Sequence, residues 1–292
     1  MIPKEILKKI RRIQITTSRM VTDVFAGQYH SVFKGKGMEF DEVREYLPGD
    51  DIRSIDWNVT ARMGHPYIKK FVEERELTVM LLLDASSSSN FGSVNQLKKQ
   101  LAAEISSVLA FSAIQNNDKV GLIIFTDRIE KFIPPRKGTS HVLRVIREAL
   151  YYKAEGKGTD ISGALDFLNR VTKRRTIAFI ISDFFDSGFK NLLSASNKRH
   201  DIIAVTITDP REIELPKIGI VELDDAETAS STIVDTGDDI QRAKYKDDSL
   251  KRIKERLGLL NSVNVDSIDI LTDKAYTKEL IRFFKAREKR LA

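Results

Sequence analysis

Four short runs of apolar residues, rich in valine and isoleucine, recur along the chain, and an aspartate follows each of them. The runs cover residues 78–83, 120–125, 176–182 and 202–208. Because apolar runs without alternation are typical of strands buried on both faces, they predict a parallel sheet. The aspartates that follow are Asp84, Asp127, Asp183 and Asp209. We interpret Asp127 and Asp209 as ordinary strand-end residues.

Segments with helical periodicity separate these runs. Apolar side chains recur every three or four positions in residues 97–109, 142–150 and 161–168, which is the spacing of one helix face. Either Thr159 or Asp160 would cap the third helix. Strands that alternate with helices predict an α/β fold, with a doubly wound, mostly parallel sheet that helices flank.

The flanking parts of the chain follow other patterns. In residues 1–76, glycines and prolines separate short segments, of which 30–33 and Tyr67–Val72 have the pattern of strands. We expect an N-terminal helix and a small strand-rich lobe there, with the single tryptophan, Trp57, in its core. Residues 77–292 are expected to form the α/β domain and a helical C-terminal extension.

The extension begins with an acidic stretch, residues 219–239, which carries seven acidic and no basic side chains. Its β-branched segments predict two edge strands, and a basic helix, a strand and a final helix follow. The expected ranges are, in chain order, 220–223, 232–234, 240–257, 267–271 and 274–290.

Composition limits the classes of function. The chain has 292 residues and no cysteine, which excludes disulfides, thiolate metal sites and a cysteine nucleophile. Its net charge of +6 is uneven, because residues 1–36 carry 8 basic and 2 acidic side chains and residues 241–292 carry 14 and 8. A nucleic acid would have to bind at these ends, where acids and bases are interleaved, so we expect no nucleic-acid partner.

The chain lacks the pattern of a membrane-spanning or secreted protein. No apolar run approaches the roughly 18 residues that cross a bilayer, and charges interrupt the first ten residues, where a signal peptide needs an apolar stretch. We therefore expect a cytoplasmic protein. An amphipathic N-terminal stripe leaves peripheral membrane contact open, beside packing on the chain's own fold. The stripe consists of Ile2, Ile6, Leu7, Ile10 and Ile13.

Polar side chains gather at the predicted strand ends in three segments. Asp84-x-Ser86-x-Ser88 follows the first strand, residues 156–160 open the third helix, and residues 182–184 follow the third strand. Loops at the carboxyl ends of parallel strands meet at one edge of a sheet. Carboxylate and hydroxyl oxygens at this spacing suit a hard cation such as Mg²⁺, which keeps several of its waters.

These three segments resemble the metal-ion-dependent adhesion site of the von Willebrand factor A domain. Its motif has Asp-x-Ser-x-Ser in one loop, a threonine in a second and an aspartate in a third. The resemblance implies a von Willebrand factor A-like fold and a bound Mg²⁺ or Mn²⁺. The implied ligand set is Asp84, Ser86, Ser88, Thr159 and Asp183. If Asp84 is the only carboxylate in direct contact, the ion keeps an open position for a partner's acidic residue.

The N-terminal region carries a second resemblance. Residues 37–62 contain Gly-Met-Glu-Phe, Arg-Glu-Tyr, Pro-Gly-Asp-Asp and Asp-Trp. They resemble the signature of the bacterial "domain of unknown function 58" family, as do residues 268–273. The resemblance covers roughly residues 25–290. It implies a protein partner, either a MoxR-type AAA+ ATPase or its client, and a role in chaperone-like assembly or stress response.

The charged run over residues 39–56 leaves two interpretations open. It could be a surface for a partner, or an internal ion-pair network in which arginines hold aspartates through forked hydrogen bonds. The network would consist of Arg44, Arg53, Arg62, Asp50, Asp51 and Asp56.

Two classes of function fit the metal motif. The first is a non-enzymatic adaptor that binds its partner through the ion. The alternative is a metal-dependent phosphoester hydrolase that uses Asp84 and Asp183 around the same ion. A hydrolase needs a base or nucleophile beside the metal, whereas these loops contain no histidine and only one spare carboxylate, Asp160. The sequence therefore favours the adaptor.

Overall fold

The computed structural model describes residues 39–72, 76–93, 96–224 and 231–291. The chain divides into two compact units, with a boundary between Leu77 and Thr78. The lobe ends at Leu77, and the α/β domain begins at Thr78. The predicted strand at 30–33 and the N-terminal amphipathic stripe lie outside the described residues.

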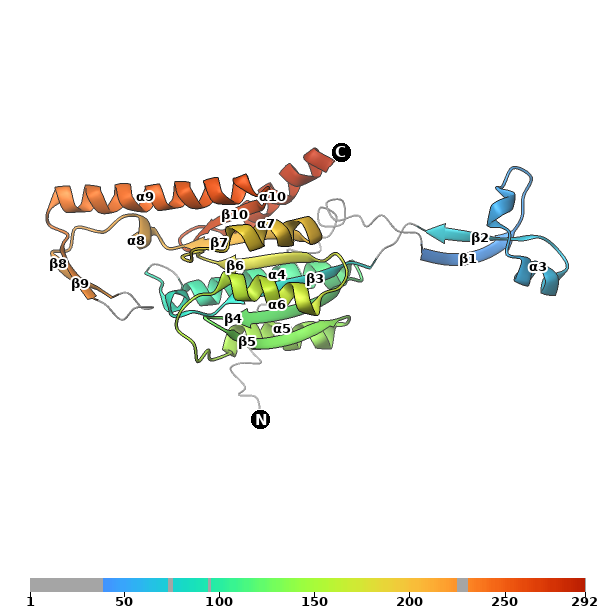
Figure 1. Cartoon of the computed structure of the whole chain (residues 1–292), viewed down its shortest axis with the longest axis horizontal. Coiled ribbons are helices and arrows are strands. Elements are labelled where there is room, and N and C mark those ends of the chain that lie inside the picture. The colour runs from blue at the N-terminus through green and yellow to red at the C-terminus, as the bar shows by residue number, and fades with distance from the viewer. Residues whose placement is uncertain (1–38, 73–75, 94–95, 225–230, 292) are drawn as a thin grey trace. The chain divides into compact units, whose positions relative to one another are not determined.

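A six-stranded sheet forms the centre of the α/β domain (Figure 1). Its strand order is β10-β7-β6-β3-β4-β5, and neighbouring strands are parallel except for β4 and β5. The prediction of a mostly parallel sheet flanked by helices is confirmed. The strands are β3 Thr78–Asp84, β4 Lys119–Phe125, β5 Ile129–Arg136, β6 Ile177–Ser182, β7 Asp201–Thr208 and β10 Asp266–Leu271.

Helices cover both faces of this sheet. Met80 and Leu82 of β3 belong to a buried core with Leu165 of α6 and Leu193 of α7. Because side chains alternate along a strand, Leu81 points to the opposite face, and α4 packs against β3. The helices are α4 Lys98–Gln115, α5 Thr139–Tyr151, α6 Ile161–Val171, α7 Lys190–Arg199, α8 Pro210–Ile213, α9 Asp239–Ser262 and α10 Tyr276–Leu291. Within the described ranges, no helix combines the length and apolar character that a bilayer-spanning segment needs.

Two parts of the α/β domain differ from the sequence pattern. β5 has no counterpart among the predicted strands, because Pro134 and Pro135 argue against a central strand; the sheet tolerates them since β5 is its edge. Strands β8 (Ile220–Asp224) and β9 (Ser231–Asp235) form at the predicted places. They pair with each other in a separate antiparallel ribbon and do not extend the main sheet.

The N-terminal lobe contains a two-stranded antiparallel sheet of β1 (Glu39–Glu45) and β2 (Tyr67–Val72). Between them lie the short 3-10 helix η2 (Ile52–Ser54) and helix α3 (Trp57–Met63). The prediction that Trp57 lies in the core is wrong, since its side chain is 67% exposed. Trp57 follows the N-cap of α3, and this first-turn position faces solvent.

The charged run of the lobe is partly an ion-pair network. The Arg44 guanidinium donates two hydrogen bonds to the Asp50 carboxylate, with N···O distances of 2.7 and 2.9 Å. These bonds lower the pKa of Asp50. Asp56 pairs with Lys69 at 3.3 Å and caps α3. Asp51 caps η2. The predicted pairing is therefore confirmed for Arg44 with Asp50, whereas Asp56 is held by a lysine from β2.

Asp209 has the structural role expected of a strand-end residue. Its buried carboxylate accepts hydrogen bonds from the backbone N–H of Ser93 at 2.9 Å and from the Thr272 hydroxyl at 2.7 Å. It also forms a capping box with Glu212 at the start of α8. These bonds join the loop before α4 to the ends of β7 and β10.

Candidate metal centre

The sheet reverses its direction of growth at β3. From β3 the chain proceeds to β4 and β5 on one side, and then returns to place β6, β7 and β10 on the other side. Loops after β3 and β6 therefore diverge, and ligands of doubly wound sheets bind in the crevice between such loops. Asp84 is the last residue of β3, and Asp183 directly follows β6.

The Asp84 carboxylate is buried, with 5% of the residue exposed. Its Oδ1 accepts a hydrogen bond from the backbone N–H of Ser86 at 2.9 Å, and its Oδ2 accepts one from the Ser182 hydroxyl at 2.6 Å. In the described part of the chain, no cationic side chain pairs with Asp84. Burial, and then the nearby charge of Asp183, raise the pKa of Asp84 to about 6.

The serines of the motif line the turn that follows β3. The Ser86 and Ser88 hydroxyls lie 3.0 Å apart and share a hydrogen bond. Ser89 donates to the Ser86 carbonyl at 2.7 Å and so fixes the short 3-10 helix η3 (Ser87–Asn90). The turn therefore holds two hydroxyl groups beside the Asp84 carboxylate.

Asp183 has a very different environment from Asp84. The Lys98 side chain is buried, with 3% of it exposed, and its ammonium donates to the Asp183 Oδ2 at 2.8 Å and to Glu212 at 2.6 Å. The Arg256 guanidinium donates to the Asp183 carbonyl at 3.1 Å. The next residue, Phe184, has a φ of 59°, a strained value for a residue with a side chain. Phe184 is buried in the core, which holds the loop in this conformation.

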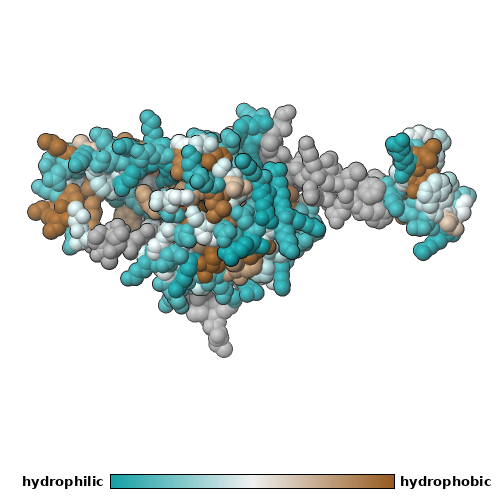
Figure 2. Space-filling model, in the orientation of Figure 1, coloured by the Kyte–Doolittle hydropathy of each residue, from teal (hydrophilic) through white to brown (hydrophobic). Residues whose placement is uncertain are grey.

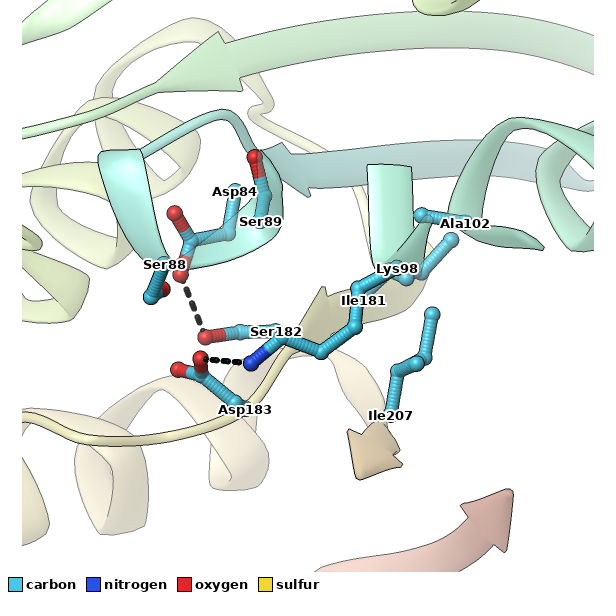
Figure 3. A pocket seen from close by; sticks show the side chains of 9 residues that line it. All are labelled: Asp84, Ser88, Ser89, Lys98, Ala102, Ile181, Ser182, Asp183 and Ile207. Atoms are coloured by element: carbon cyan, nitrogen blue, oxygen red, sulfur yellow. Dashed lines mark hydrogen bonds and ion pairs between the residues drawn. The ribbon is translucent and has the colours of Figure 1, made fainter. Parts of the chain in front are cut away.

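The carboxyl groups of Asp84 and Asp183 point toward each other in a small pocket (Figure 3). The pocket has a volume of about 20 Å³, which is room for one water-sized occupant. Its nine lining residues are Asp84, Ser88, Ser89, Lys98, Ala102, Ile181, Ser182, Asp183 and Ile207.

Thr159 is the one predicted ligand that lies on the loop before α6. Its loop lies beside the motif, because the Ser87 N–H donates to the Lys157 carbonyl at 2.9 Å. Neither Thr159 nor Ser86 is among the residues that line the pocket, but Ser86 is hydrogen-bonded to both Asp84 and Ser88. The N-cap of α6 is Asp160, which accepts from the Gly163 N–H at 2.8 Å. The structure thus brings four predicted ligands together and places the fifth on an adjoining loop.

The donor set fits a hard cation that keeps much of its hydration. The described residues contain no group of three or more His, Cys, Asp or Glu side chains that could hold a metal ion, so hydroxyls and waters would have to supply most of the shell. Two carboxylates and neighbouring hydroxyls suit Mg²⁺ or Mn²⁺, for which waters complete the shell. Asp84 also carries an unneutralised charge that a cation would offset.

Lys98 lines the pocket and Glu212 pairs with it, and neither was predicted as part of the site. Ser182 also lines the pocket, and it was predicted only as part of the segment 182–184 and not as a ligand. Ser182 is adjacent to Asp183, so a pattern of hydrogen-bonding residues at strand ends could have indicated it. Lys98 lies three and seven positions before the buried Leu101 and Ile105 of α4, on the buried face of the helix. That spacing was its only sequence signal, because the partners of Lys98 lie 85 and 114 residues away.

Gly156→Ala is expected to weaken Mn²⁺ binding by about tenfold, a typical cost of disturbing groups that orient ligands. A Cβ at Gly156 would lie 2.1 Å from both the Thr126 hydroxyl and an Asp127 carboxylate oxygen. The loop that carries Thr159 would therefore move. Calorimetric titration measures the change, with Gly158→Ala as the control, since its Cβ would meet only Asp127 at 3.7 Å. Equal affinities for both variants and wild type would exclude Thr159 from the site.

Comparison with known proteins identifies the family. A family model described as "Protein of unknown function DUF58" matches residues 42–255, and the chain belongs to this family. An uncharacterized protein of Mycobacterium tuberculosis is 31% identical over 290 residues, covering 96% of this chain and 89% of that one. The uncharacterized protein YeaD of Bacillus subtilis is 27% identical over 105 residues, covering 36% of this chain and 24% of that one.

Two of the solved structures that align with this chain come from species of Bacteroides. An aerotolerance-related membrane protein from Bacteroides fragilis shares 16% identity with a TM-score of 0.50, covering 73% of this chain and 99% of that one. The conserved hypothetical protein BatB from Bacteroides thetaiotaomicron shares 16% identity with a TM-score of 0.47 over the same shares. At 16% identity, the likeness to the Bacteroides fragilis protein shows a similar fold and nothing more.

Proposed function

We propose that this chain is a von Willebrand factor A-like protein that binds other proteins through a metal ion and is not an enzyme. In this proposal Asp84, Ser86 and Ser88 hold Mg²⁺ or Mn²⁺, and Thr159 and Asp183 complete the set. A bound ion would supply a Lewis-acidic position that accepts an acidic side chain of the partner.

The observation that carries the proposal is the Asp84 carboxylate itself. It is buried at the switch point of the sheet, it faces a pocket of one-water size, and both of its oxygens accept only from neutral donors. A buried carboxylate without a counter-charge is unfavourable. A site that binds a cation explains why the fold tolerates this arrangement.

The groups that a hydrolase would need are engaged elsewhere. The carboxylate of Asp160 caps α6, and that of Glu212 is bound to Lys98. None of the nine residues that line the pocket is a histidine. These contacts favour the adaptor over a metal-dependent phosphoester hydrolase.

The partner in this proposal is a MoxR-type AAA+ ATPase or its client, and the family resemblance is the support for it. A cytoplasmic location is part of the same proposal, supported by the absence of cysteine, which fits a reducing compartment. Membrane contact through the N-terminal stripe stays a prediction, because those residues lie outside the described part of the chain.

Capture of a purified MoxR-type ATPase on the immobilised chain tests the function. We expect retention with Mg²⁺, and loss of retention with a chelator or with Asp84→Ala. Retention that is indifferent to the chelator would contradict metal-bridged binding. Turnover of p-nitrophenyl phosphate that is abolished by Asp84→Ala would favour the hydrolase.

A further inference from the structure

The two carboxylates of the pocket are unequal, and Lys98 is the cause. Asp84 accepts hydrogen bonds only from neutral groups, whereas Asp183 is in direct contact with the buried Lys98 ammonium at 2.8 Å. Figure 3 shows the Lys98 side chain reaching across the pocket from α4 to Asp183. A cation of the chain itself therefore already occupies one side of the pocket.

Both oxygens of Asp183 are engaged. Lys98 donates to Oδ2, and the backbone N–H of Phe185 donates to Oδ1 at 3.3 Å. Each oxygen keeps a second lone pair, but a divalent ion in direct contact with Asp183 would lie close to the Lys98 ammonium and be repelled by it. Mg²⁺ and Mn²⁺ readily keep water in place of a protein ligand.

Glu212 gives Lys98 a second anchor. The Lys98 ammonium lies 2.6 Å from a Glu212 oxygen, and its charge lies 6.0 Å from the centre of the Phe185 ring. If Lys98 moved away from Asp183, its charge would stay paired with Glu212. The triad of Lys98, Asp183 and Glu212 can therefore change its pairing without leaving the ammonium alone in the protein interior.

We propose that Lys98 is an internal competitor of the metal ion: it neutralises Asp183, keeps Asp84 as the ion's only directly bound carboxylate, and so weakens metal binding. This inference rests on the proposed metal site and deepens it. An ion with fewer carboxylate ligands retains more positive charge for the acidic residue of a partner. Lys98 thus lowers the affinity of the site for the ion and raises the affinity of the bound ion for the partner.

Mn²⁺ titration of Lys98→Gln tests the proposal. We expect the variant to bind Mn²⁺ about tenfold more tightly than wild type, because Asp183 becomes available. Lys99→Gln is the matched control, since Lys99 lies one position along α4 and donates to the Tyr152 carbonyl away from the pocket. We expect its Mn²⁺ affinity to equal that of wild type.

A second variant, Lys98→Gln/Glu212→Gln, protects the test against misfolding. It also shows whether Mn²⁺ affinity depends on the position of Lys98 or only on the net charge of the chain. Lys98→Gln alone leaves Glu212 and Asp183 without their cation, whereas Lys98→Gln/Glu212→Gln removes one charge of each sign. The double variant keeps the net charge of wild type, so tighter Mn²⁺ binding would come from the freed Asp183. Thermal unfolding confirms that each variant is folded before titration.

The outcomes separate this inference from the proposed function. If wild type binds Mn²⁺ and the folded double variant binds it no more tightly, the inference is overturned and the metal site stands. If wild type binds no Mn²⁺ and the double variant does, Lys98 is a competitor but the proposed function is overturned. Absence of binding in all variants overturns both.

Discussion

Replacing Asp84 with asparagine is expected to stabilise the metal-free protein by about 3 kcal/mol near neutral pH, because each unit of pKa shift corresponds to about 1.4 kcal/mol. Burial and the charge of Asp183 raise the pKa of Asp84 from 3.8 to about 6. Asparagine has the same shape and does not ionise. It can still accept from the Ser86 N–H, and its amide can donate to the rotatable Ser182 hydroxyl.

The sign of the effect follows from the protonation states. Well below pH 3.8 the carboxyl group is protonated in both the folded and the unfolded chain, so it has no net effect on stability. As the pH rises toward 6, the unfolded chain loses this proton before the folded chain does. The free energy of unfolding therefore falls over this interval, and above pH 6 the full penalty remains.

Denaturant unfolding of wild type and Asp84→Asn with a chelator present measures the difference. Asp209→Asn is the matched control, because Asp209 is also a buried strand-end aspartate. Burial would raise the pKa of Asp209, but the hydrogen bonds from Ser93, Arg211 and Thr272 outweigh it and lower the pKa. The control should therefore lose stability. Asp84→Asn that is less stable than wild type would show that Asp84 carries no such penalty.

The affinity of wild type for Mn²⁺ is expected to fall about tenfold between pH 7 and pH 5, because metal binding requires a deprotonated ligand. With its pKa at about 6, Asp84 is mostly ionised at pH 7 and mostly protonated at pH 5. An ordinary exposed aspartate would remain ionised over this whole interval. A fall in Mn²⁺ affinity between pH 7 and pH 5 therefore indicates that the buried Asp84 carboxylate binds the ion.

Titrations at pH 5, 6 and 7 in buffers with different ionisation enthalpies measure both the affinity and the protons released. Below pH 6, we expect proton release to approach one proton for each bound Mn²⁺. An affinity that is constant from pH 7 to pH 5, with no proton released, would mean that Asp84 does not bind the ion.

The parts of the fold that the sequence predicts are those with a strong local pattern. Four of the parallel strands, β3, β4, β6 and β7, are almost continuous apolar runs. Asp84 ends one of them and Asp183 follows another, so the metal motif could be placed at one sheet edge. β5 could not be predicted in this way, because Pro134 and Pro135 argue against a strand. The two prolines are tolerated only because β5 lies at the edge of the sheet. The exposure of Trp57 could not be predicted either, because a large aromatic residue usually lies in a core.

The charges of the site depend on contacts that no local pattern contains. Lys98 reaches Asp183 and Glu212 across 85 and 114 residues of sequence, and only the packing of α4 against the sheet brings them together. A lysine in a helix normally points to solvent. The asymmetry between the Asp84 and Asp183 carboxylates is therefore visible only in the folded chain.

Calorimetric titration of Mn²⁺ into wild type, Asp84→Asn and Asp209→Asn tests the metal centre most directly. We predict one bound ion per chain for wild type and for Asp209→Asn, and an affinity reduced by more than about 100-fold for Asp84→Asn, since loss of a direct ligand exceeds the effect of an orienting group. Binding of equal strength by wild type and Asp84→Asn, or no binding by wild type, would contradict the proposed centre.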